Sequence, residues 1–141
     1  MGLEGLGQDG HSSRISVDDI LTVPLAEANH LMSGLDWPGA ITDVSACAAW
    51  LKANGCSKVT VIGFCMGGAL ALGSGVSVED VDACIAFYGF NKGLADLTTM
   101  KKPCQCHFGD KDEQAGFSDV AAANELEGLL KQSGCPLEFY R

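Results

Sequence analysis

The sequence predicts an α/β protein built on a parallel sheet of about four strands flanked by helices. Two observations predict it. Short apolar runs recur along the chain, at residues 58–62, 82–89, 103–109 and 136–140. Stretches with helical periodicity lie between them, and strands that alternate with helices favour parallel pairing through right-handed crossovers. The 141 residues, 47% of them hydrophobic, are enough for one domain with its own core.

The first part of the chain divides into a lead-in and a short helix. Residues 1–24 are rich in glycine and polar side chains, so we expect a loosely ordered lead-in there and the domain proper over residues 25–141. Apolar residues then recur at helical spacing after Pro24, and Gly34 is expected to end this helix.

A second helix is predicted from Trp37 to about Asn54. Asp36 is an acidic cap residue and Pro38 falls in the first turn, which together form a helix-start signal. The stripe expected to be buried consists of Ile41, Val44, Ala48 and Leu51.

The central feature of the sequence is a strand, a sharp turn and a helix, with a cysteine at the turn. Gly63 and Gly67 lie two positions before and two positions after Cys65, and Gly68 follows directly. This is the G-x-S-x-G spacing of a nucleophile elbow, with cysteine in place of serine. Small neighbours are expected because the chain before and after such a turn passes very close to the nucleophile.

The helix after this turn is expected to end at residues 73–75, where two glycines flank a serine. A second buried strand follows at 82–89, and residues 91–102 give no clear helix. In the third strand, at 103–109, alternation places Cys104 and Cys106 on one face with Phe108, so we expect these thiols in the core.

The last predicted elements are a helix and a strand. Ser118 is the expected cap of the helix, and Ser133-Gly134 is its expected end. A fourth strand then runs over residues 136–140.

Composition excludes several classes of function. The net charge of −9 argues against nucleic-acid binding. An odd number of cysteines, seven, argues against a disulfide framework and favours a reducing, cytoplasmic setting. Residues 59–78 carry no charge but are broken by glycines, so we expect no membrane span. We expect no cofactor and no metal, because the phosphate-loop motifs and zinc-ligand spacings are missing.

Candidate chemistry gathers where predicted strands end, because function in open α/β sheets lies at the carboxyl ends of the strands. The positive end of the helix dipole favours a thiolate at Cys65, and the backbone N–H of Met66 is placed to stabilise an oxyanion. Asp110 and Asp112 follow the third strand. In sites of this kind, an acidic residue that follows a later strand orients the histidine base.

Here the sequence resembles the dienelactone hydrolase family, which consists of α/β-hydrolases with a cysteine nucleophile. The specific part is Gly63-Phe64-Cys65-Met66-Gly67-Gly68; supporting parts are Leu35-Asp36-Trp37, Phe87-Tyr88-Gly89 and His107-Phe108-Gly109-Asp110-Lys111-Asp112. The resemblance covers about residues 25–141. It implies a partial α/β-hydrolase fold, cleavage of a small ester or lactone, and a Cys-Asp-His triad. Cys65 matches the nucleophile and Asp112 the acid, a better match than Asp110.

The resemblance also shows departures from the family pattern. The early strands of that fold have no counterpart here, and the family's histidine follows a strand within which this chain ends, at Arg141. For His11, His30 and His107 a structural role is expected. We therefore expect little turnover from this chain, and two alternatives stay open: a non-catalytic, degenerate fragment of the fold, or a small thiol-redox protein. We also expect self-association through a bare sheet edge at residues 59–62.

Overall fold

A computed structural model describes residues 26–141, so the predicted lead-in at residues 1–24 lies outside the described residues. Residues 26–33 form a helix, as the periodicity after Pro24 indicates, and this helix belongs to the unit Met1–Gly34. A second compact unit comprises Leu35–Arg141 and holds all the elements discussed below.

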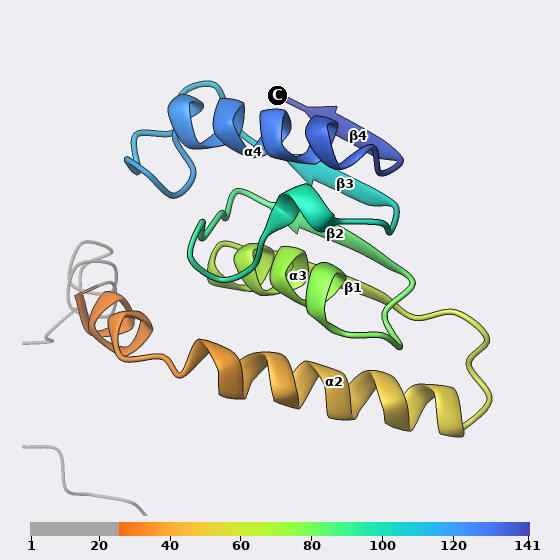
Figure 1. Cartoon of the computed structure of the whole chain (residues 1–141). Coiled ribbons are helices and arrows are strands. Elements are labelled where there is room, and N and C mark those ends of the chain that lie inside the picture. Colours follow the sequence, from red (N-terminus) through yellow and green to blue (C-terminus); the bar gives the residue numbers. More distant parts are fainter. Residues whose placement is uncertain (1–25) are drawn as a thin grey trace, which may run out of the picture. The chain divides into compact units, whose positions relative to one another are not determined.

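The second unit is built on a parallel sheet, which confirms the predicted α/β class. Its four strands are β1 (Thr60–Phe64), β2 (Ala83–Phe87), β3 (Cys104–His107) and β4 (Leu137–Tyr140). They lie in the order β1-β2-β3-β4, and each pair of neighbours is parallel (Figure 1). The architecture is that of a partial α/β-hydrolase fold.

Helices cover one face of this sheet. Both α3 (Met66–Ser77) and α4 (Val120–Ser133) lie on that face, together with the short 3₁₀ helix η1 (Leu97–Thr99) (Figure 1). The core beneath them is formed by small and aliphatic side chains and buried thiols, namely Ala71, Leu72, Cys84, Ala86, Cys104, Cys106, Leu126 and Leu130. The predicted burial of Cys104 and Cys106 is thus confirmed.

The opposite face of the sheet carries a ladder of stacked rings. Phe64, Phe87, His107 and Tyr140 are cross-strand partners, and neighbouring ring centroids lie 4.7, 4.3 and 4.9 Å apart along this series. Phe64 is 55% exposed and Tyr140 48% exposed. Among the described residues, this face is therefore open and aromatic at the carboxyl end of every strand.

Helix α2 (Trp37–Ala53) begins where the sequence predicts, because the Asp36 side chain accepts a hydrogen bond from the Gly39 N–H at 3.2 Å. Its predicted buried stripe is wrong in part. Ala48 is buried, but Leu51 is exposed. The helix meets the rest of the unit along a narrow strip that includes Ala48, so the last turn of the stripe has nothing to pack against.

The predicted helix end at residues 73–75 is also wrong, because α3 continues to Ser77. A Cβ at Gly73 would lie 2.8 Å from the Leu94 side chain, and one at Gly75 would lie 2.9 Å from the Cys84 sulfur. These glycines therefore let the helix approach its neighbours closely. Tertiary packing explains them better than helix termination does.

Helix α4 ends at Gly134 as predicted, with φ +74°, but it begins one residue later than expected. Asp119 is the cap residue, because its carboxylate accepts a hydrogen bond from the Ala122 N–H at 3.0 Å. Ser118, the predicted cap, is instead a buried residue of the preceding turn.

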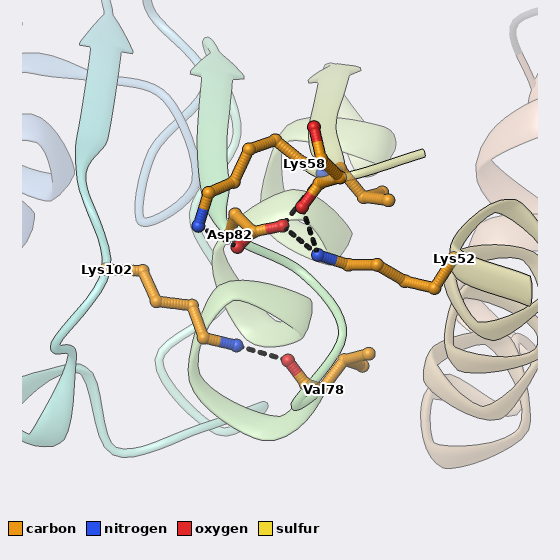
Figure 2. A network of polar contacts seen from close by, with 7 residues as sticks. Lys52, Lys58, Val78, Asp82 and Lys102 are labelled. Atoms are coloured by element: carbon orange, nitrogen blue, oxygen red, sulfur yellow. Dashed lines mark hydrogen bonds and ion pairs between the residues drawn. The ribbon is translucent and has the colours of Figure 1, made fainter. Parts of the chain in front are cut away.

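An ion-pair network joins three elements at the amino-terminal edge of the sheet. Asp82, just before β2, bonds Lys52 of α2 at 2.5 Å, Lys58 at 2.8 Å and the Val59 N–H at 2.8 Å (Figure 2). The Lys52 and Lys58 ammonium groups hold the pKa of the Asp82 carboxyl well below its usual range. The network therefore fixes the start of β1 against both α2 and β2.

The uncharged run at residues 59–78 is divided between β1, the Cys65 turn and α3. Over residues 26–141, no helix has both the length and the apolar character needed to cross a membrane.

Candidate active site

Cys65 lies at the turn between β1 and α3 in a backbone conformation that side chains rarely adopt. Its φ is 54° and its ψ is −122°, which costs of order 1–3 kcal/mol for a residue with a Cβ. Main-chain hydrogen bonds hold it there. The Cys65 N–H donates to the Phe87 carbonyl at 3.0 Å, and the Cys65 carbonyl accepts from Gly68 and Ala69 at 2.9 and 3.3 Å. The thiol is half-buried.

Glycines make this turn sterically possible. A Cβ at Gly63 would lie 1.8 Å from the Gly67 carbonyl oxygen, and one at Gly68 would lie 2.6 Å from the Phe87 carbonyl oxygen. A Cβ at Gly67 would meet nothing within 4 Å. The expectation that this position needs a small side chain is therefore wrong, because the space beside it is open. The main chain of Gly67 lies against Gly63, so position 63 is the one at which a side chain cannot fit.

The first turn of α3 supplies hydrogen-bond donors beside the thiol. Met66 and Gly67 are the first two residues of the helix, so their N–H groups have no intrahelical acceptor. The Cys65 side chain makes no capping bond to this turn. These donors and the helix dipole together favour negative charge on an atom bound next to Cys65.

Asp112 lies in a turn after β3 and is half-buried, whereas Asp110 is exposed. The Asp112 N–H donates to the Gly109 carbonyl at 3.2 Å, and its carboxylate accepts from the Gln114 N–H at 3.0 Å. Within residues 26–141, no hydrogen bond joins Asp112 to Cys65 or to a histidine. Asp112 is thus at the expected strand end, with its carboxylate engaged only locally.

Two of the three histidines lie in the described part of the chain. His107 is stacked between Phe87 and Tyr140, and its Nε2 lies 3.1 Å from the Gln105 side-chain oxygen. His30 is on the helix at 26–33, in the other unit. His11 is outside the described residues. His107 is therefore committed to the ring ladder on the open face.

The turn after β2 packs against the Cys65 turn, a contact that the sequence alone did not predict. Tyr88 has φ +38°, an unusual value for a residue with a side chain. A Cβ at Gly89 would lie 1.8 Å from the Cys65 carbonyl oxygen. Phe90 donates to the Phe117 carbonyl at 3.0 Å, which ties this turn to the segment after β3. The glycine after the second strand was the available signal, because a glycine next to a strand end often marks close backbone approach.

Five of the other six thiols are either buried or exposed, and the sixth, Cys135, is half-buried with its sulfur 3.7 Å from the Leu130 carbonyl oxygen. Cys84 and Cys104 are buried with their sulfurs 3.4 Å apart; this contact and burial raise the pKa of Cys84, and a sulfur contact with Cys106 raises that of Cys104. Such thiols are poor nucleophiles. Cys47 and Cys56 are exposed but lie in α2 and just before β1, away from the carboxyl ends of the strands. Cys65 alone joins partial exposure to a strained turn and free N–H donors.

A cavity of about 590 Å³ is lined by residues at the amino-terminal half of the strands, among them Thr60, Ile85 and Gln105. The Cys65 turn is at the other, carboxyl end of the strands, so this cavity cannot hold a substrate against the thiol. Within residues 26–141, no cluster of three or more potential metal ligands occurs.

The comparisons with known proteins agree with this geometry. The family model described as "Dienelactone hydrolase family" matches residues 23–140. No curated protein matches the chain. With the match extending over nearly the whole sequence, the chain belongs to the dienelactone hydrolase family.

Proposed function

We propose that Cys65 is the nucleophile of a site that cleaves an ester or lactone bond in a small molecule. Membership of the family indicates a hydrolase of the dienelactone hydrolase type. The observation that carries the role of Cys65 is its strained conformation at the strand-to-helix turn, held by the bond to the Phe87 carbonyl. Strain of this kind persists where surrounding structure imposes it, often at functional sites.

In the proposed reaction, the Cys65 sulfur attacks the carbonyl carbon of the substrate. The carbonyl oxygen gains negative charge and is stabilised by the Met66 N–H at the start of α3. The carbon–oxygen bond of the ester then breaks, the leaving oxygen takes up the proton that the Cys65 thiol has lost and departs as the alcohol, and an acyl thioester remains on Cys65. Water hydrolyses the thioester, which releases the acid and the free thiol.

Asp112 is proposed as the acidic residue that orients the base of this site. Asp112 follows β3 and Cys65 follows β1, so both lie at the carboxyl end of the parallel strands, which supports this role. Gly63, Gly67 and Gly68 are proposed as the elbow glycines, with the steric demand concentrated at Gly63 and Gly68. We propose no cofactor for the reaction, and a reducing, cytoplasmic setting is supported by the seven free cysteines.

The second candidate is a degenerate member that acylates but turns over slowly. It is favoured by one observation: in the described part of the chain, no histidine contacts Cys65, and His107 is held in the ring ladder. Without a base, deacylation loses orders of magnitude in rate. A thiol-redox function is the weaker alternative, since Cys65 has no C-x-x-C partner in the sequence.

The test follows release of p-nitrophenol from p-nitrophenyl acetate by the full chain. We expect a burst of product equal to the protein concentration, which acylation of Cys65 produces under either candidate, and the steady phase after it is slow only for the degenerate one. Cys65→Ala should abolish the burst, while the control Cys56→Ala, which removes another exposed thiol, should leave it unchanged. A burst retained in Cys65→Ala would contradict the proposal. Fast sustained turnover would instead rule out the degenerate candidate.

A further inference from the structure

Two buried thiols lie opposite each other in the middle of the sheet. Cys84 on β2 and Cys104 on β3 are register partners, and their sulfurs are 3.4 Å apart. Both residues are buried, with exposed fractions of 1% and 3%. Strand β2 lies between β1 and β3, and β3 lies between β2 and β4, so both strands have a neighbour on each side. Interior strand pairing therefore sets the position of both thiols.

The spacing of the two strands suits a disulfide between these thiols. Neighbouring strands lie about 4.8 Å apart, and the Cα atoms of a disulfide lie about 4.4 to 6.8 Å apart. The sulfurs of Cys84 and Cys104 are in contact without a bond, and they must close from 3.4 Å to about 2.05 Å to form one. A Cα spacing at the short end of the range favours a bond that is easily reduced.

Cys106 is a third buried sulfur beside this pair, 3.6 Å from the Cys104 sulfur. It lies two residues further along the same strand, where successive side chains on one face are roughly 6.6 Å apart. The Cβ atoms of a disulfide lie only about 3.5 to 4.5 Å apart. A bond between Cys104 and Cys106 would therefore distort β3, and Cys84 is the better partner for Cys104.

We propose that Cys84 and Cys104 form a site of reversible oxidation, at which a peroxide converts the two thiols into a disulfide between β2 and β3. The Cys84 thiol donates toward the Cys104 sulfur, which favours negative charge there. The Cys104 sulfur attacks one peroxide oxygen, the O–O bond breaks, and the Cys104 proton leaves with the other oxygen as water, which gives a sulfenic acid. The Cys84 sulfur then attacks the Cys104 sulfur, the S–O bond breaks, and the Cys84 proton leaves with that oxygen as a second water.

The surroundings of the pair make its oxidation slow. The contact with Cys104 and burial raise the pKa of Cys84, and the contact with Cys106 raises the pKa of Cys104. Little thiolate is therefore present at neutral pH, and the thiolate is the form that reacts with a peroxide. We expect the exposed thiols of Cys47 and Cys56 to be oxidised first and the buried pair to follow on longer exposure.

The test treats the folded full chain with hydrogen peroxide, blocks the remaining thiols by alkylation and maps the linked peptides by mass spectrometry. Cleavage after acidic residues separates Cys84 from Cys65, because Glu79 and Asp82 lie between them. We expect the link between Cys84 and Cys104 to exceed every other link of these two residues at least tenfold, and to disappear after reduction with dithiothreitol. Full oxidation of the exposed thiols without this link would overturn the proposal.

Three controls connect the link to the native register and separate it from the chemistry proposed at Cys65. Cys106→Ala removes the neighbouring buried sulfur, and Cys65→Ala removes the proposed nucleophile; both variants should keep the link. In concentrated urea, the same treatment should spread the links of Cys84 over the other cysteines. A link that is equally abundant in folded and unfolded protein, or that is lost in Cys106→Ala, would contradict a site formed by Cys84 and Cys104.

Discussion

The turn at Cys65 follows β1 and the turn at Asp112 follows β3, two strands of one sheet separated by β2, yet the two turns are built very differently. At Cys65, main-chain hydrogen bonds fix the backbone, and Gly63 and Gly89 lie where no side chain fits. At Asp112, the hydrogen bonds are local to the turn, and a Cβ added at Gly109 would meet nothing within 4 Å. The position of Cys65 is therefore over-determined, while that of Asp112 is set by its own turn alone.

The support of Cys65 comes from one short stretch of the chain. Cys65 is held by β1, α3 and the end of β2, all within residues 60–89. A role for Asp112 needs contacts to a base that the described residues do not provide.

The largest effect is expected for Gly63→Ala. The added Cβ would lie 1.8 Å from the main-chain oxygen of Gly67, which cannot move without displacing the first turn of α3. We expect a loss of at least about 3 kcal/mol in the free energy of unfolding, measured by urea denaturation. Gly109→Ala is the matched control in the other turn and should change stability by less than about 0.5 kcal/mol. Similar values for the two variants would abolish the contrast.

A smaller effect of opposite sign is expected for Cys65→Gly. Glycine adopts φ 54° without the steric cost that a Cβ brings, although it loses more backbone entropy on folding. We expect a net gain of about 1 kcal/mol in the free energy of unfolding, measured by thermal denaturation. Asp112→Gly, at a position without a positive φ, should give no gain. A destabilised Cys65→Gly protein would show that the conformation of Cys65 is not strained.

The smallest effect concerns acid stability at the other end of β1. Because Lys52 and Lys58 depress the folded-state pKa of Asp82, its contribution to stability is present above the unfolded-state pKa of about 4 and is lost as pH falls below it. Asp82→Asn should remove this part of the pH dependence in unfolding curves recorded between neutral and acidic pH. Asp80→Asn, a neighbouring carboxylate outside the network, should leave it intact.

Local signals were enough to predict much of this fold. The Asp36 cap, the Gly134 end of α4 and the four strands each follow from short stretches of sequence. Predictions failed where a distant contact decides the outcome. Gly73 and Gly75 are spacers against other elements, and Leu51 has no partner to cover it.

The same limit applies to the candidate site. The spacing of Gly63, Cys65 and Gly67 predicted the turn, but it could not show that Gly89, from another strand end, completes it. Nor could alternation along β3 show that His107 belongs to a ring ladder spanning all four strands. Both features depend on strand order, which a single sequence indicates only in outline.

Cys65 is set apart from the other thiols by its turn. The most direct measurement is peptide mass spectrometry of the full chain after brief exposure to p-nitrophenyl acetate. We predict an acetyl group on Cys65 well before any appears on Cys47 or Cys56, although both of those thiols are more exposed. Acetylation of Cys47 and Cys56 at the same rate as Cys65, or ahead of it, would show that the turn does not activate the Cys65 thiol.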